Sequence, residues 1–181
     1  MTDLLVLELV DKELVTDQII LNVGYDVENL TDPARKKSYG GEIVTDHYGR
    51  KIPKHAHGTE TLPGYTSSPR ELVDAALRLY ERIVDPKLLV RRIYVVAGRV
   101  LPEAEAPDNA AAQQLDLFSD YTCADKREAE NAKAREREKK RQAAILAIQH
   151  KYGKNAILKG TNFEDGAMTR KRNEQIGGHK A

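Results

Sequence analysis

Two kinds of hydrophobic spacing divide the first hundred residues. Apolar side chains recur every three or four positions over residues 4–14, which predicts a helix. Over residues 18–25 the period falls to two, which predicts a strand with one buried face. The side chains expected on the buried face are Ile19, Leu21, Val23 and Tyr25, and those on the opposite face are Ile20, Asn22 and Gly24.

A second helix and a second long strand follow further along the chain. Ser68, Pro69 and Glu71 are typical of a helix start, because Ser can cap, Pro suits the first turn and Glu completes a capping box. The helix is expected to end at Val84, since Pro86 blocks its continuation. Its buried stripe would be Leu72, Ala76, Leu79 and Ile83. Residues 88–100 predict the strand, with Ile93, Val95 and Ala97 facing the helices and Arg92, Tyr94, Val96 and Gly98 facing away.

The segment between these elements, residues 26–66, shows little helical pattern. We interpret it as a long, turn-rich connection with a short strand near residues 58–62. The order is therefore helix, strand, strand, helix, strand, which predicts an α+β fold in which an antiparallel sheet carries two helices on one face. The uncovered face would carry Asn22, Arg92 and Tyr94, and we expect it to be a solvated binding surface.

The second half of the chain is expected to be largely solvated. After a domain over residues 1–100, residues 101–124 are polar and rich in Pro and Ala, which indicates a flexible linker. Residues 125–153 predict a long charged helix that ends at Gly153. It is either a solvated spacer or a segment that folds against DNA or a protein partner. Residues 154–181 form a polar, basic tail, and we interpret the part after Lys159 as a second docking element.

Composition narrows the class of protein. The 181 residues include 29 Lys and Arg against 28 Asp and Glu, and a net charge of +1 neither requires nor excludes a nucleic-acid partner. The single cysteine, Cys123, excludes an internal disulfide framework and is typical of a reducing cytoplasm. No apolar run approaches the roughly 20 residues that span a bilayer, and the first residues lack the basic start of a signal peptide. We therefore expect a cytoplasmic protein with no membrane partner.

A short motif places three apolar side chains inside the polar linker. Apolar anchors on a flexible tether are typical of peptides that dock into a partner's pocket, and an adjacent amide can fix their register. The alternative is a short strand or helix start that packs on its own domain. The residues of the motif are Gln114, Leu115, Asp116, Leu117 and Phe118. They resemble the peptide with which bacterial replication proteins bind the sliding clamp, the β subunit of the replicase.

Four further segments resemble one family. They are residues 15–26, VTDQIILNVGYD; residues 46–59, DHYGRKIPKHAHGT; residues 89–93, LVRRI; and residues 172–181, RNEQIGGHKA. Together they resemble the C-terminal part of bacterial Y-family translesion DNA polymerases of the UmuC/DinB type, especially the Gram-positive branch. The resemblance covers nearly the whole chain, and the clamp motif lies where that family places it. It implies a role in DNA repair, damage tolerance and the SOS response.

In that family this part is the little finger, a β-α-β-β-α-β domain that holds primer–template DNA. The resemblance implies that the first strand is missing here, together with the palm whose carboxylates bind Mg²⁺ for nucleotidyl transfer. Nothing in the sequence replaces those carboxylates, so we expect neither enzymatic activity nor a cofactor from this severed portion. If the missing strand is central, its neighbours would lack ladder partners. The isolated chain would then be marginally stable or pair with another chain.

The resemblance also selects the residues expected to contact DNA. Binding to a duplex needs cations spaced along the phosphates. The candidates are Arg50, Lys51, Lys54, His55, His57, Arg91 and Arg92. Without the resemblance, these would be interpreted as ordinary solvated charges. His55 and His57 also have a spacing that can bind zinc, with His47 and Cys123 as further ligands. Because that spacing is common and Cys123 lies across the linker, we expect no metal.

Three classes of function remain open at this point. The first is a DNA-binding and clamp-docking portion of a translesion polymerase, which we favour. The second is a protein that binds the clamp without binding DNA. The third is one half of a split DNA polymerase, whose catalytic carboxylates would come from a separately encoded chain.

Overall fold

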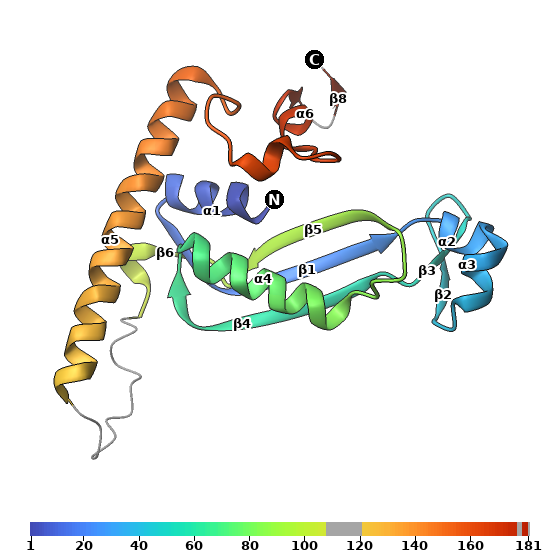
Figure 1. The fold of residues 1–181 in the computed structure, drawn as a ribbon, viewed down its shortest axis with the longest axis horizontal. Helices are drawn as coiled ribbons and strands as arrows, with labels where there is room; N and C mark the ends of the chain where they lie inside the picture. The colour runs from blue at the N-terminus through green and yellow to red at the C-terminus, as the bar shows by residue number, and fades with distance from the viewer. Residues whose placement is uncertain (108–120, 177–178, 181) are drawn as a thin grey trace. The chain divides into compact units, whose positions relative to one another are not determined.

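The computed structural model describes residues 1–107, 121–176 and 179–180. They form an α+β fold with a mostly antiparallel sheet and several helices, so the predicted class is confirmed at that level (Figure 1). The chain divides into two compact units. The sheet unit comprises residues 2–9 and 13–109, and the tail unit comprises residue 1 with residues 10–12 and 110–181.

The central strand of the sheet is β1 (Leu14–Tyr25). It pairs antiparallel with β4 (Ala56–Thr66) along one edge and with β5 (Val90–Gly98) along the other. The short strand β6 (Leu101–Pro102) extends the second ladder by pairing with the first residues of β1. We expected that a missing central strand would leave its neighbouring strands without ladder partners. That expectation is wrong, because β1 is the central strand and forms a ladder with both β4 and β5.

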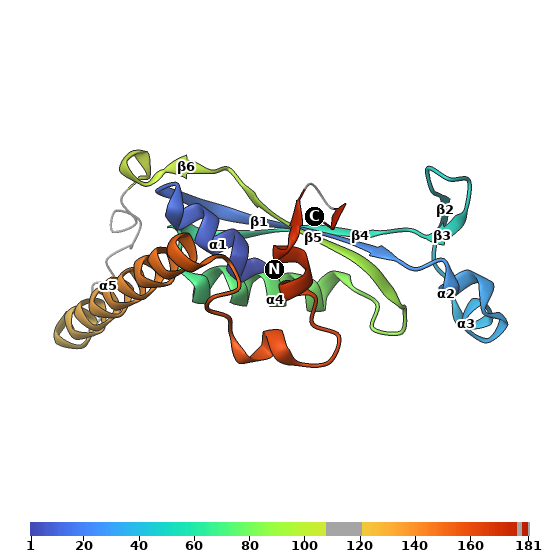
Figure 2. The same ribbon diagram turned by 90° about the horizontal axis from the view of Figure 1, so that it is seen from above.

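The alternation predicted for β1 is confirmed by its burial. Ile19, Leu21, Val23 and Tyr25 are buried, whereas the intervening residues are partly exposed. The helix α4 (Pro69–Ile83) packs on the buried face through Leu72, Ala75, Ala76 and Leu79. Its start is also confirmed, since the Ser68 side chain accepts a hydrogen bond from the Glu71 amide. Figures 1 and 2 show α4 lying along the sheet.

The first helix is shorter than expected. Helix α1 spans Thr2–Asp11 and buries Val6 and Leu9, instead of continuing to residue 14. Glu13 adopts a left-handed backbone conformation, with φ of 53°, and Leu14 already belongs to β1. A left-handed residue ends a helix, so Leu14 is an apolar strand residue that happens to fit the helical spacing.

The connection between β1 and β4 is more structured than predicted. It contains helices α2 (Glu28–Thr31) and α3 (Pro33–Ser38) and a hairpin of β2 (Ile43–Thr45) with β3 (Lys51–Pro53). Local hydrogen bonds shape these elements: the Asp32 side chain caps α3, and the Asp46 side chain accepts from the amides of Tyr48 and Arg50 in the hairpin turn. Such bonds leave no hydrophobic period in the sequence, which is why these elements were missed.

Asn29 ties this connection to the start of β5. Its side chain is completely buried, and its Nδ2 donates to the carbonyl oxygens of Asp26 and Leu89, each at 2.9 Å. Its Oδ1 accepts from the Leu89 amide at 2.8 Å. A buried amide that satisfies three backbone groups fixes the approach of β5 to β1.

The residues directly after β5 are also ordered. Beyond β6, the 3-10 turn η1 (Glu103–Glu105) is held by a hydrogen bond from the Glu103 amide to the Glu13 carbonyl, at 2.9 Å. The predicted linker therefore begins too early at residue 101, because Leu101 pairs with Val15 in the sheet.

The tail unit contains one long helix, α5 (Tyr121–Tyr152). Gly153 follows it with φ of 92°, and its amide bonds to the Gln149 carbonyl at 2.8 Å, which is a typical helix end. Lys140 forms an ion pair with Glu136 one turn away. Shorter elements follow: η3 (Gly160–Phe163), α6 (Thr169–Asn173), β7 (Gln175–Ile176) and β8 (His179–Lys180). Among the described helices, none combines the length and apolar character needed to cross a membrane.

Candidate nucleic-acid interface

The face of the sheet opposite α4, here called the open face, brings several predicted DNA contacts together. Asn22 of β1 pairs with His57 of β4 on one side and with Tyr94 of β5 on the other, so the three residues form one row across the sheet. Arg92 belongs to the neighbouring row, opposite Gly24. Because paired residues share a face, His57, Tyr94 and Arg92 project from the same surface.

Two more rows continue the open face away from Arg92. Ile20 pairs with Thr59 and Val96, and Gln18 pairs with Thr61 and Gly98. The four rows contain no carboxylate. The acidic residue of this part of β4, Glu60, lies on the opposite face, where Arg82 of α4 binds it at 2.7 Å. Glu60 therefore adds no negative charge to the open face.

Arg92 is the best placed cation on the open face. Its guanidinium carbon lies 5.6 Å from the centre of the Tyr94 ring, and it forms no ion pair with any carboxylate in the described residues. Lys51 and both histidines, His55 and His57, are likewise exposed and without an acidic partner in the part of the chain that the structure describes. These four side chains can meet a phosphate without first losing a carboxylate.

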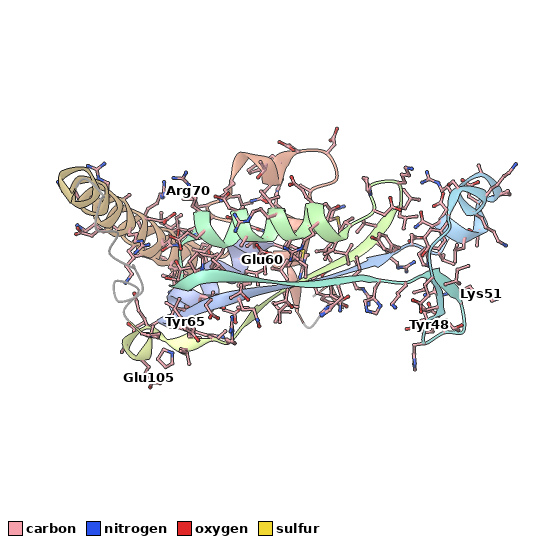
Figure 3. The ribbon with its side chains drawn as sticks, turned by 90° about the horizontal axis from the view of Figure 1, so that it is seen from below. Tyr48, Lys51, Glu60, Tyr65, Arg70 and Glu105 are labelled. Carbon is pink, nitrogen blue, oxygen red and sulfur yellow. The ribbon has the colours of Figure 1, made fainter. Side chains whose placement is uncertain are left out.

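The hairpin of β2 and β3 stands at one end of the sheet. Figures 2 and 3 show it projecting on the side away from α4, so it borders the open face at the end where β4 begins. Its turn presents Tyr48, which is 79% exposed, and the guanidinium carbon of Arg50 lies 5.1 Å from the centre of that ring. Figure 3 labels Tyr48 and Lys51 here and Glu105 at the far end. At the other end of the rows, Arg99 donates a hydrogen bond to the Thr61 hydroxyl at 3.3 Å and pairs with Asp17 at 2.9 Å.

Three other predicted DNA contacts already have acidic partners. Arg50 binds Asp46 at 2.7 Å, Lys54 binds Glu42 at 2.6 Å, and Arg91 binds Asp26 at 3.3 Å. The hydrogen bond from Arg50 lowers the pKa of Asp46, and the hydrogen bond to Glu42 raises the pKa of Lys54. These pairs are exposed, so a phosphate can compete for each cation, but each contact would gain less than one made by a free cation.

The remaining predictions about sites have different outcomes. The clamp motif, Gln114–Phe118, lies outside the described residues. Within the described residues, no group of three or more His, Cys, Asp or Glu side chains is arranged to hold a metal ion. Sequence reasoning missed Tyr48, Thr59 and Thr61 as members of the interface. The alternation of residues 57–61 was the available signal for the two threonines.

Comparison with known proteins identifies no family for this chain. No family model matches it, and neither a curated protein nor a solved structure is similar to it.

Proposed function

We propose that this chain is the DNA-binding and clamp-docking C-terminal portion of a bacterial Y-family translesion DNA polymerase of the UmuC/DinB type. It would hold primer–template DNA against the open face and attach to the sliding clamp through Gln114–Phe118. The strongest support is the sheet register, which brings His57 and Arg92, from distant segments of the chain, into adjacent rows that contain no carboxylate.

Binding would rest on phosphates rather than on base sequence. Backbone-positioning contacts come from cations and exposed polar groups. The open face and the hairpin beside it offer both, with Arg92, Lys51 and the two histidines near one end and Thr59 and Thr61 further along. If about four phosphates are neutralised, log K should fall against log salt concentration with a slope of about −3.6. The proposal assigns no nucleotidyl transfer to these residues.

Fluorescence anisotropy with a labelled primer–template, at several salt concentrations, tests the DNA part of the proposal. Arg92→Ala should weaken binding and reduce the salt slope by about 1. Arg70→Ala is the matched control, because Arg70 lies on α4 on the other side of the sheet (Figure 3). An affinity that is independent of salt, or equal losses in the two variants, would argue against the open face as the DNA surface.

The clamp part needs its own measurement. We expect the chain to bind the purified bacterial sliding clamp with micromolar affinity, about −8 kcal/mol. The double substitution Leu117→Ala/Phe118→Ala should abolish binding, because it removes the apolar anchors. Gln113→Ala, directly outside the motif, should leave binding unchanged. If the folded wild-type chain does not bind, the motif is a coincidence or a packed strand.

A clamp-binding protein without DNA affinity is the second candidate. It is favoured by the ion pairs of Arg50, Lys54 and Arg91, which occupy three of the seven predicted DNA contacts, and by the balanced net charge. The two candidates differ in one result. The clamp-binding protein without DNA affinity would bind the clamp but show no salt-sensitive affinity for primer–template DNA.

A further inference from the structure

The formal net charge of +1 is divided unevenly along the chain. Residues 1–107 contain 14 Lys and Arg against 17 Asp and Glu, so their formal charge is −3. Residues 121–181 contain 15 Lys and Arg against 8 Asp and Glu, so their formal charge is +7. A basic segment joined to an acidic one is typical of a chain whose basic part binds a polyanion.

Side-chain amides bring two basic segments of the tail unit together. Asn173 Nδ2 donates to Asn155 Oδ1 at 2.8 Å, and Asn155 Nδ2 donates to the carbonyl oxygen of Arg170 at 3.3 Å. These bonds hold the residues that follow α5 against α6. The exposed cations around them, here called the basic cluster, are Lys151, Lys154, Arg170, Lys171 and Arg172. None of the five forms an ion pair with a carboxylate that the structure describes.

Two aromatic rings of the tail unit lie beside cations of this cluster. The Nζ of Lys151 lies 5.1 Å from the centre of the Tyr152 ring, and the guanidinium carbon of Arg170 lies 5.6 Å from the centre of the Phe163 ring. A ring with a cation over its face presents positive charge there instead of a surface for stacking. These pairs therefore suit a phosphate better than a base.

The basic surface continues along α5 as a line. Lys133 and Arg137 are exposed, and Lys151 follows them 18 and 14 residues later. With 3.6 residues per turn, these spacings place the three cations on one face of the helix, over a length of about 27 Å. A phosphate backbone matches such a line, because it repeats its charge about every 3.4 Å along each strand. A protein partner would need acidic side chains distributed over the same length.

We propose that the tail unit is a second DNA-binding element, which contacts the phosphate backbone through the basic cluster and the adjoining face of α5. The proposed function places DNA on the open face of the sheet unit. This inference goes beyond it by adding a contact from different residues, and it leaves that DNA in place. The counterions released at the two surfaces add, so the full chain should show a salt slope steeper than about −3.6.

Neutralising three cations of the basic cluster tests this contact. In the full chain, Lys154→Gln/Lys171→Gln/Arg172→Gln should reduce the salt slope for primer–template DNA by about 2.7, because each lost phosphate contact removes about 0.9. Lys154→Arg/Lys171→Arg/Arg172→Lys is the matched control. It changes the same three side chains but keeps their charge, so it should bind with the wild-type slope. Fluorescence anisotropy measures the slopes, and far-UV circular dichroism shows that each variant is folded.

The results separate this inference from the proposed function. A wild-type slope in the Gln variant, or an equal loss in the charge-preserving control, would overturn the inference and leave the open face to be judged by Arg92→Ala alone. A reduced slope in the Gln variant, with Arg92→Ala binding like wild type, would support the tail contact and refute the open face. If both surfaces hold the same DNA, the losses in log K from the two sets of substitutions should add.

An acidic protein as the partner of the basic cluster is a further outcome of the same measurement. It predicts that the Gln variant binds DNA with the wild-type slope, and that result would overturn the assignment of this surface to DNA.

Discussion

Replacing Asn29 by Ala should destabilise the sheet unit more than any single hydrogen bond would suggest. The substitution removes three hydrogen bonds from a site that is completely buried. The carbonyl oxygens of Asp26 and Leu89 keep other donors, since they also accept from the amides of Asn29 and Asp26. The Leu89 amide loses its acceptor and is left as an unsatisfied donor facing the buried position of Asn29.

These consequences give the size of the effect. An orphaned buried amide costs about 1–3 kcal/mol, and each of the two lost bonds to carbonyls that retain a donor costs about 0.5–1.5 kcal/mol. The free energy of unfolding should therefore fall by roughly 2–6 kcal/mol, a large part of the 5–15 kcal/mol typical of a domain.

Urea unfolding followed by far-UV circular dichroism measures this loss, and Thr31→Ala is the matched control. Thr31 is an exposed residue of the same helix, so its substitution should change stability by no more than about 0.5 kcal/mol. A loss below about 1 kcal/mol for Asn29→Ala, with the same denaturant dependence as wild type, would mean that water replaces the amide and that the site is not dry.

Three further predictions concern other parts of the sheet unit. Gly58→Ala should cost about 1–3 kcal/mol in urea unfolding, because a Cβ there would lie 2.9 Å from the Leu79 side chain, which is fully buried and cannot swing away. Ser68→Ala should lower the free energy of unfolding by about 1 kcal/mol in the same assay, since it removes the cap of α4. The pKa of Asp46 is lower in the folded protein than in the unfolded chain, so the ionised carboxylate stabilises the hairpin at any pH above the unfolded pKa. This stabilisation is lost as the pH falls through the folded pKa, below about pH 4. NMR should therefore show the amide of Arg50 shifting at low pH, with no such transition in Asp46→Asn; an Asp46 carboxyl that titrates at an ordinary pKa would refute this.

The elements that could be predicted from sequence are those whose pattern is set by a single buried face. In β1 every second residue from Ile19 to Tyr25 is buried, and α4 has both a capping serine and a regular apolar stripe. Strand β4 lacks such a pattern, which is why only part of it was predicted. Its inward positions include Gly58, which allows close packing on α4, and Glu60, which is neutralised by Arg82. Neither is apolar, so the alternation of burial has no hydrophobic counterpart in the sequence.

The members of the open face could be predicted one at a time, but not as a surface. Arg92 and Tyr94 follow from the alternation of β5, and His57 follows from the resemblance. Their adjacency depends on the strand register, which puts Asn22 between His57 and Tyr94. The register of β1 with β5 also shifts between Gly24 and Tyr25. Register over such long connections is determined by packing and by buried hydrogen bonds such as those of Asn29, which no local pattern reveals.

The position of β1 between its two partners has a consequence for synthesis on the ribosome. Asn22 pairs with His57, about 35 positions later in the chain, and with Tyr94, about 70 positions later. At a translation rate of 5–20 residues per second, β5 is therefore synthesised roughly 4–14 seconds after β1. During that interval the edge of an apolar strand is open to any nascent chain nearby. Slowing translation between the codons of β4 and β5 should therefore lower the soluble yield, whereas slowing it after β6 should not.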